Sequence, residues 1–321
     1  MGYKIVVVNK NFDDALKDTI RAAAEKFGCS VDFFWSDGPE SAAEAADADI
    51  VYGFAPQTVA AAKNIKWLAL STAGVDAYVK PGVVPENCII TNSKGAFGLA
   101  LAEHTVMVAL MLVRGMQRVY RGMEAGLWPA PVPQRSIKDS RITLLGAGDI
   151  GSCTARRLKP FEPACITAVC RSGKSSEPAY DRVVPISELD DILPQTDILI
   201  MSLPSTPETV GILSAEKIAR LPDDAFVINV GRGTAVDEAA LIDALENDRL
   251  AGAALDVMAH EPLAADDPLR AVKNCILTPH IAGNLTVPYT RQTNVRLFCE
   301  NLEKFCTGQP MDRVIDRNRG Y

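Results

Sequence analysis

The chain has 321 residues, of which 48% are hydrophobic and 23% charged, a composition typical of a folded globular protein and not of a disordered one. This length allows two domains of ordinary size, each with its own core. The formal net charge is −7 and no stretch is rich in lysine and arginine, so we expect no nucleic-acid partner.

Eight cysteines occur without a CxxC pair or a Cys/His cluster at zinc spacing, which predicts free thiols and no metal site. The first residues, "GYKIVVVNK", form a short strand-like run, and polar residues follow it too soon for the hydrophobic region of a secretory signal peptide. No later apolar run reaches membrane-spanning length. We therefore expect a cytoplasmic protein with no membrane partner.

Along the first hundred residues, short β-branched runs alternate with helical patterns, which is typical of βαβ units and a parallel sheet. Helices are expected between the strands. Together these elements predict one small doubly wound unit, with strands at 4–9, 31–35, 49–54, 67–72 and 88–92.

A long apolar helix is expected over 98–122, followed at 127–140 by the proline-rich arm "LWPAPVPQRSIKDS". Glu103, His104 and Arg114 interrupt the helix too much for a membrane span, yet the rest is too apolar to face water. We expect a homodimer built on residues 98–114 and the arm, because such a surface would be costly to expose.

A second series of strands follows the arm, and six strands with helical connections would complete a dinucleotide-type unit. A final helix in 289–308 could pack back on the first unit. The expected fold class is α/β, with two doubly wound parallel-sheet domains. The six expected strands lie in "RITLLGAG", "CITAVCR", "DILIMSLP", "AFVINVG", "LAGAALDV" and "CILTPH".

The segment "LLGAGDIG" places Gly146, Gly148 and Gly151 directly after an expected strand and before an expected helix. Glycines at this spacing permit a tight turn, close approach of the backbone to a pyrophosphate and contact between helix and strand, while the helix N-terminus supplies N–H donors. A bare GxGxxG motif is weak, but this context predicts dinucleotide binding.

The end of the next strand bears on which dinucleotide is bound. NAD would need a carboxylate there for its ribose 2′-hydroxyl, and the position holds Cys170. Arg171, Ser172 and Lys174 offer two cations and a hydroxyl, which suit a 2′-phosphate. We therefore favour NADP, with NAD as the alternative if Arg171 only stacks on adenine and Lys174 is a solvated surface charge.

Arg232, Glu261 and His280 follow successive late strands, whose carboxyl ends line the ligand crevice of a doubly wound sheet. Reduction of a ketone needs a proton donor beside its oxygen, and histidine serves as donor in one direction and base in the other. A neighbouring carboxylate stabilises imidazolium, and arginine can bind a substrate carboxylate. Each residue alone has an ordinary structural explanation, so this interpretation rests on all three together with the nucleotide fold.

The sequence resembles the D-isomer-specific 2-hydroxyacid dehydrogenase family. The resemblance implies a flavodoxin-like substrate domain over 1–98 and 288–321, with an inserted Rossmann dinucleotide-binding domain over 99–287. The matching segments are "STAGVD", "TNSKG", "LAEHT", "LLGAGDIG", "SLPSTPETVGIL", "FVINVGRGTAVDEAALIDAL", "AGAALDVMAHEPL", "LTPHIAG" and "ENLEKFCTGQP".

The resemblance also assigns roles to individual residues. It implies that Arg232 orients the substrate, that His280 is the acid and base, and that Glu261 is its partner. In the turn 71–76 it implies an anion nest for the substrate carboxylate, although an ordinary strand-to-helix turn would have the same sequence. The remaining implied contacts are Asp149 and Ile150 at the pyrophosphate, Leu203, Pro204 and Thr209 along the adenosine half, Val230, Gly231 and Asp256 at the nicotinamide half, Gly283 elsewhere on the cofactor, and Phe54, Ala73, Gly74 and Val75 at the substrate.

The expected activity is hydride transfer between NADPH or NADH and a small 2-oxo acid, giving an (R)-2-hydroxy acid, as in a glyoxylate/hydroxypyruvate reductase or another 2-oxo acid reductase. The alternatives are an NAD-dependent phosphoglycerate dehydrogenase and a dinucleotide-sensing protein of the co-repressor kind. Of the other histidines, His104 is expected at an interface and His260 as an exposed neighbour of Glu261.

Overall fold

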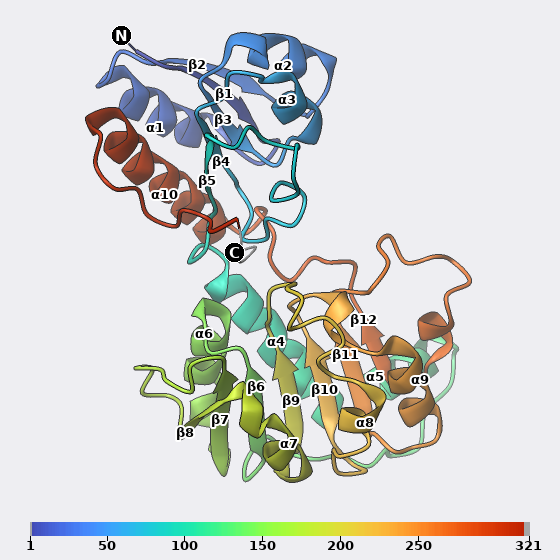
Figure 1. Cartoon of the computed structure of the whole chain (residues 1–321). Coiled ribbons are helices and arrows are strands. Elements are labelled where there is room, and N and C mark those ends of the chain that lie inside the picture. Colours follow the sequence, from blue (N-terminus) through green and yellow to red (C-terminus); the bar gives the residue numbers. More distant parts are fainter. Residues whose placement is uncertain (1, 318–321) are drawn as a thin grey trace. The chain divides into compact units, whose positions relative to one another are not determined.

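The computed structural model describes residues 2–317, which divide into two compact units. Unit 1 contains the residues up to Phe97 and those from Asn284 onwards, and unit 2 is Gly98–Gly283. These bounds differ by a few residues from the domain limits expected from the sequence. Each unit is built on its own parallel sheet (Figure 1), which confirms the predicted α/β class with two parallel-sheet domains.

Five parallel strands form the sheet of unit 1, in the order β2-β1-β3-β4-β5. Side chains of β1 alternate between two hydrophobic clusters, with Ile5 and Val7 in one and Val6 and Val8 in the other. Because both faces of the sheet are apolar, both must be covered by helices. The strands are β1 (Lys4–Val8), β2 (Ser30–Phe34), β3 (Ile50–Gly53), β4 (Trp67–Ala69) and β5 (Ile89–Thr91).

Helices α1 (Asp14–Glu25) and α10 (Pro288–Thr307) pack against each other and cover the Ile5 face. Phe298 of α10 stacks on Tyr52 and Trp67, with ring centroids 4.1 and 5.2 Å away. Helix α10 is therefore part of the core of unit 1. The opposite face packs against the region of α2 (Pro39–Glu44) and α3 (Pro56–Ala61).

The sheet of unit 2 has seven parallel strands in the order β12-β11-β10-β9-β6-β7-β8, one more than expected. The additional strand, β8, is short, ends at a proline and lies at the edge of the sheet, so its apolar pattern was too brief to be recognised. The strands are β6 (Arg141–Leu145), β7 (Cys165–Cys170), β8 (Arg182–Pro185), β9 (Ile198–Met201), β10 (Phe226–Asn229), β11 (Gly252–Leu255) and β12 (Cys275–Leu277).

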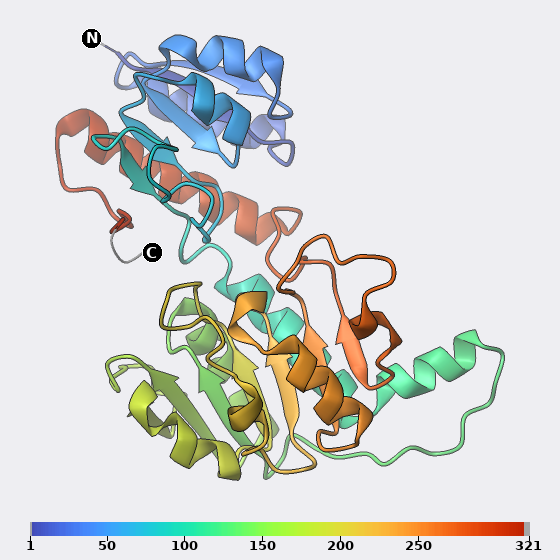
Figure 2. The same cartoon turned by 45° about the vertical axis from the view of Figure 1, so that its right-hand side comes forward.

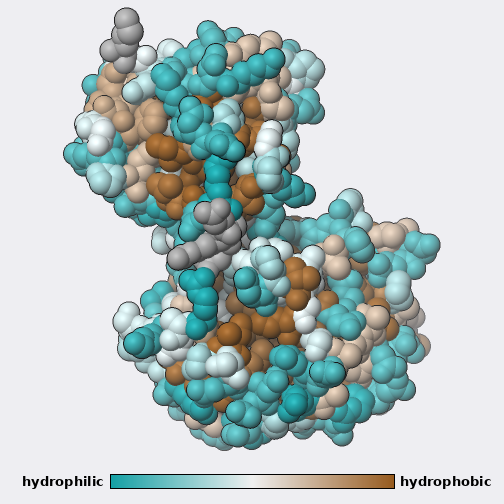
Figure 3. Space-filling view, in the orientation of Figure 1, coloured by the Kyte–Doolittle hydropathy of each residue, from teal (hydrophilic) through white to brown (hydrophobic). Residues whose placement is uncertain are grey.

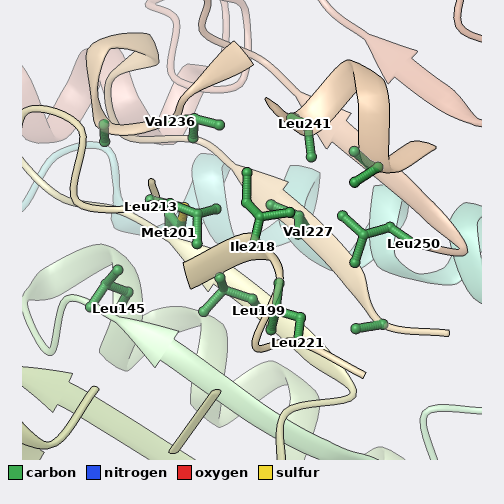
Figure 4. Close-up of a cluster of buried hydrophobic side chains, with 14 of the residues drawn as sticks. Leu145, Leu199, Met201, Leu213, Ile218, Leu221, Val227, Val236, Leu241 and Leu250 are labelled. Atoms are coloured by element: carbon green, nitrogen blue, oxygen red, sulfur yellow. The ribbon is translucent and has the colours of Figure 1, made fainter. Parts of the chain in front are cut away.

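Helices cover both faces of this sheet. On one face, α4 (Gly98–Val113) contacts α6 (Asp149–Leu158), β10 and β11. The other face carries the main core cluster, where side chains from the strands meet those from the short helices (Figure 4). Those helices are α7 (Leu189–Ile192), α8 (Ala215–Ile218) and α9 (Glu238–Glu246), and the labelled core residues include Leu199, Met201, Ile218, Val227 and Leu241.

The expectation of one continuous helix over 98–122 is wrong. The chain forms α4 and then α5 (Met116–Glu124), with a bend of 77° between them. The break falls at Gly115, which has φ 63°, a left-handed conformation that glycine adopts readily and that ends a right-handed helix. Figure 2 shows α5 projecting from unit 2 and the irregular segment after it running back to the sheet.

Because α4 turns many of its side chains into its own unit, most of its apolar surface needs no partner. Exposed large hydrophobic side chains instead gather on α5 and the arm, namely Met116, Tyr120, Met123, Leu127 and Trp128.

No single described helix is long and apolar enough to cross a membrane, although the bent pair of α4 and α5 passes that test by length and composition. One face of the molecule shows mainly hydrophilic residues, with hydrophobic ones in patches (Figure 3).

Candidate active site

His280 and Glu261 form a hydrogen-bonded pair in unit 2. Nδ1 of His280 lies 2.7 Å from Oε2 of Glu261, and the backbone N–H of Met258 donates to Oε1 over 2.9 Å. An ionised carboxylate only accepts, so Nδ1 carries the hydrogen and Nε2 is left for other chemistry. The imidazole side chain is half exposed, which keeps it accessible to a ligand.

A second carboxylate holds the loop that carries Glu261. Oε1 of Glu238, in the first turn of α9, accepts a hydrogen bond of 2.6 Å from the backbone N–H of Ala259. Burial raises the pKa of Glu238, and the Ala259 hydrogen bond opposes that rise. His260, between Ala259 and Glu261, is exposed as expected.

The turn after β12 is anchored by Asp256, a buried residue just beyond β11. Its carboxylate accepts hydrogen bonds from the hydroxyl of Thr278 (2.7 Å) and from the backbone N–H groups of Ile281 and Ala282 (both 2.9 Å). Its backbone carbonyl also accepts from the N–H of His280 over 2.8 Å. These contacts hold His280 at φ 54°, in the left-handed region that non-glycine residues rarely adopt.

His104 supports the same turn from α4. Its Nε2 lies 3.4 Å from Oγ1 of Thr278, whose hydrogen is already donated to Asp256, so Nε2 of His104 is the donor. Burial lowers the pKa of His104, and the nearby Asp256 carboxylate partly opposes this shift. Within unit 2, therefore, His104 belongs to the hydrogen-bond network that supports the turn carrying His280.

A pocket of about 550 Å³ opens beside the His280–Glu261 pair. Most of its walls are apolar, so a ligand there would lose much of its hydration. Its lining residues are Met258, Glu261, Pro262, Leu263, Arg270, Leu277, Thr278, Pro279 and His280.

Arg232 follows β10, the strand next to β11. The buried Asn229 shapes this loop, since its Nδ2 donates to the carbonyl of Arg232 (2.9 Å) and its Oδ1 accepts from the N–H of Gly231 (3.0 Å). Because β10, β11 and β12 are adjacent parallel strands, Arg232, Glu261 and His280 all follow their carboxyl ends, on the same side of the sheet.

The glycine loop fits a dinucleotide pyrophosphate. Gly146 has φ 115°, and a Cβ on Gly151 would lie 2.1 Å from the carbonyl oxygen of Gly146, so helix and strand meet closely there. A Cβ on Gly148 would enter open space, and no side chain caps the N-terminus of α6. Its first-turn N–H groups can therefore serve an anion. Ile150 lies in that turn, whereas the carboxylate of Asp149 lies against Gly98.

The segment after β7 forms a tight turn in which Gly173 has φ 61°. The hydroxyl of Ser172 contacts the backbone of Lys174, and the thiol of Cys170 lies 3.7 Å from that hydroxyl. The next acid along the sequence, Glu177, pairs with Arg156 over 2.8 Å, and its side chain is 8% exposed. Arg171 and Lys174 are exposed. The turn thus presents cations, and its acid is already engaged.

The other predicted cofactor residues lie in loops at the same sheet edge. Thr209 hydrogen-bonds to the carbonyl of Pro204 over 2.7 Å and so closes the loop after β9. A Cβ on Gly231 would lie 2.7 Å from the backbone of Leu203, which shows that the loops after β9 and β10 touch. Val230 is buried, and Gly283 ends unit 2.

In unit 1, the turn 71–76 has its carbonyl groups engaged by protein donors. Side chains donate to the carbonyls of Leu70, Ser71, Ala73 and Gly74 over 2.7 to 2.9 Å, and a backbone N–H donates to that of Thr72. Within the described residues, the N–H groups of Ala73, Gly74 and Val75 have no acceptor. The four side-chain donors are Ser93, Asn294, Asn92 and Thr72.

This arrangement leaves three successive N–H donors for an external anion, as in a backbone nest. Phe54, just beyond β3, is 49% exposed and meets Tyr78 edge to face with centroids 5.4 Å apart. Because β3 and β4 are neighbours, Phe54 and the turn follow adjacent strand ends.

Several supporting residues were not predicted from the sequence. Asn229, Glu238 and Thr278 contact candidate site loops, but their roles depend on partners distant in the chain. Among the residues that the structure describes, no group of three or more His, Cys, Asp or Glu side chains could hold a metal ion.

The Rossmann-type sheet, the glycine loop and the strand-end residues define a nicotinamide dinucleotide-dependent oxidoreductase. Residues 106–282 match the model of the D-isomer specific 2-hydroxyacid dehydrogenase NAD-binding domain. Glyoxylate/hydroxypyruvate reductase A of Salmonella paratyphi C is 34% identical over 274 residues, which cover 83% of this chain and 85% of that protein.

Solved structures give the same result. A D-isomer specific 2-hydroxyacid dehydrogenase family protein from Aeromonas salmonicida is 27% identical with a TM-score of 0.86, covering 99% of this chain and 100% of that one. A D-isomer specific 2-hydroxyacid dehydrogenase from Xanthobacter autotrophicus Py2, in complex with NADPH and MES, is 29% identical with a TM-score of 0.83 and full coverage of both chains.

The chain belongs to the D-isomer specific 2-hydroxyacid dehydrogenase family. It is an NAD(P)-dependent dehydrogenase that transfers hydride between a nicotinamide cofactor and a small 2-oxo or 2-hydroxy acid. The predictions of family, enzyme class and cofactor are thereby confirmed.

The two glycines of the α6 loop should respond differently to alanine. Gly148 has φ −81°, and a Cβ added there would meet no protein atom, so Gly148→Ala should change the free energy of unfolding by less than about 0.5 kcal/mol. The same variant should weaken NADPH binding at least tenfold, because the added methyl group blocks the approach of the backbone to the pyrophosphate. Gly151→Ala should cost about 2 kcal/mol of stability, because its Cβ meets backbone. Urea unfolding and fluorescence titration measure both; wild-type NADPH affinity in Gly148→Ala would contradict this assignment.

Proposed function

We propose that this enzyme is an NADPH-dependent reductase of small 2-oxo acids, with glyoxylate and hydroxypyruvate as the first substrates to test. The observation that carries the cofactor preference is the turn after β7, where Arg171 and Lys174 are exposed and Glu177 is paired with Arg156. The name of the 34% identical Salmonella reductase and the NADPH bound to the Xanthobacter protein support the choice.

The proposed chemistry divides among named groups. The bound nicotinamide supplies or accepts the hydride. Nε2 of His280 donates a proton to the substrate oxygen during reduction and takes it back during oxidation, while Glu261 fixes the ring through Nδ1 and stabilises the imidazolium form. Arg232 binds the substrate carboxylate and polarises the carbonyl.

Recognition of the substrate carboxylate is also assigned to unit 1. The N–H groups of Ala73, Gly74 and Val75 bind it as a nest, since the carbonyls of residues 70–74 accept hydrogen bonds within the protein. Phe54 would contact the rest of a small substrate through its exposed ring.

Removing the two cations should lower kcat/KM with NADPH much more than with NADH. Arg171→Ala combined with Lys174→Ala should lower kcat/KM with NADPH about 10- to 100-fold, because charge-assisted contacts to a 2′-phosphate are lost, while the value with NADH changes less than about threefold. Arg220→Ala combined with Lys273→Ala, both at exposed positions in unit 2, is the charge-matched control. Equal losses with both cofactors would overturn the NADP assignment.

Replacing the proposed acid should abolish most turnover. His280→Asn should lower kcat about 10²- to 10⁴-fold, the usual contribution of a general acid, and Glu261→Gln should cost less because the ring keeps a hydrogen-bond partner. His260→Asn, at an exposed position next to Glu261, should behave as wild type. Steady-state kinetics at 340 nm with glyoxylate measure these changes; a fully active His280→Asn variant would refute the mechanism.

We also propose a homodimer. The support is the cluster of exposed hydrophobic side chains on α5 and the arm, with Trp128 90% and Tyr120 63% exposed. Light scattering should give twice the chain mass of 34.5 kDa, and Tyr120→Glu with Met123→Glu should give the single mass, since burying two carboxylates in the contact is unfavourable. A monomeric wild type would exclude the dimer.

A cytoplasmic location is proposed as well. All eight cysteines lie within the described residues as free thiols, which suits a reducing compartment.

A further inference from the structure

We propose that Asn294, near the opposite end of the chain from the turn 71–76, is a positioning residue for that turn. The inference rests on the proposed role of the turn in binding the substrate carboxylate. Asn294 lies on α10 and is fully buried. Its Nδ2 donates to the carbonyl of Ser71 over 2.9 Å, and this hydrogen bond fixes the turn where it leaves β4.

The orientation of the Asn294 amide is set by Tyr52 of β3. The phenol donates to Oδ1 of Asn294 over 2.5 Å. Burial raises the pKa of Tyr52 well above its ordinary value, so the phenol keeps its proton and remains a donor. Oδ1 must then face Tyr52, and the N–H groups of the amide must face Ser71.

The helix that carries Asn294 is itself firmly seated. Phe298, one turn further along α10, lies parallel to the ring of Tyr52 and also stacks on Trp67. Helix α10 is thus joined to Tyr52 twice, by the hydrogen bond to Asn294 and by the stacking of Phe298, which restricts movement of the amide.

The consequence for binding follows from the direction of each peptide group. A carbonyl and the N–H of the next residue belong to one plane and point in opposite directions. Each hydrogen bond to the carbonyls of residues 72–74 therefore also orients one N–H of the nest, at Ala73, Gly74 or Val75. Asn294 acts one peptide earlier: by holding the carbonyl of Ser71 it orients the peptide between residues 71 and 72, from which the nest continues. Loss of that hydrogen bond should loosen the nest without touching any group that transfers hydride or proton.

A pair of variants separates positioning from ordinary core stability. Asn294→Leu removes the donor to Ser71, whereas Tyr52→Phe removes the hydrogen bond on the other side of the amide and leaves that donor in place. Both should unfold at lower urea concentration, because each breaks a buried hydrogen bond. Asn294→Ser provides a smaller replacement if the leucine variant does not fold.

The expected result is a rise of about tenfold in KM for glyoxylate in both Asn294 variants, with kcat and the Kd of NADPH within about twofold of wild type, because the carboxylate contact is weakened in ground and transition states alike. Tyr52→Phe should raise KM less, by about twofold to threefold, because the donor to Ser71 remains although its orientation is less restricted. Calorimetric titration of oxamate into the NADPH-loaded enzyme gives a readout that needs no turnover. Unchanged KM in the Asn294 variants, or an equal rise in Tyr52→Phe, would overturn the inference.

Gly74→Pro removes one N–H of the nest, so it tests whether the turn binds the carboxylate separately from whether Asn294 positions the turn. If that variant binds glyoxylate and oxamate as wild type, the turn is not the carboxylate site and the proposed function of unit 1 fails. If Gly74→Pro weakens binding and Asn294→Leu does not, only the role of Asn294 is wrong.

Discussion

Parallel strands that are buried on both faces restrict where polar and charged side chains can lie in this protein. The side chains of β1 in unit 1 enter apolar clusters on alternate faces, and those of β9 and β10 in unit 2 are buried throughout. Charged side chains are therefore disfavoured in the middle of each sheet, and a buried polar one such as Thr143 has a hydrogen-bond partner, Thr196. Polar and charged side chains gather where the strands end, and in unit 2 the candidate residues follow β6, β7, β9, β10, β11 and β12.

A second constraint decides which atoms at those ends remain available. Buried polar groups need partners, so most acceptors and donors in these loops are used within the protein. The carboxylate of Asp256 is taken up by the turn after β12, and that of Glu261 by His280 and Met258. Among the described residues, Nε2 of His280 and the N–H groups of Ala73, Gly74 and Val75 make no hydrogen bond within the protein. We propose that the substrate binds to these groups.

The sequence predicted much of this arrangement, because several signals were local. The GxGxxG loop follows its strand directly, and the strand-end positions of Arg232, Glu261 and His280 can be counted along the chain. The break between α4 and α5 was missed because an apolar pattern continued through Gly115, whose left-handed backbone could not be inferred from neighbours that favour helix. Strand β8 was missed because an edge strand needs few apolar residues.

By itself, then, the sequence determined the fold class, the family, the glycine loop and the identity of the strand-end residues, all of which depend on patterns within short segments. Only the tertiary structure decided which groups hold those residues in place. Asn294 reaches Ser71 across 223 positions and His104 reaches Thr278 across 174. Such pairs leave no periodic trace in one sequence, since each hydrogen bond is set by how helices pack on a sheet and not by the residues next to it.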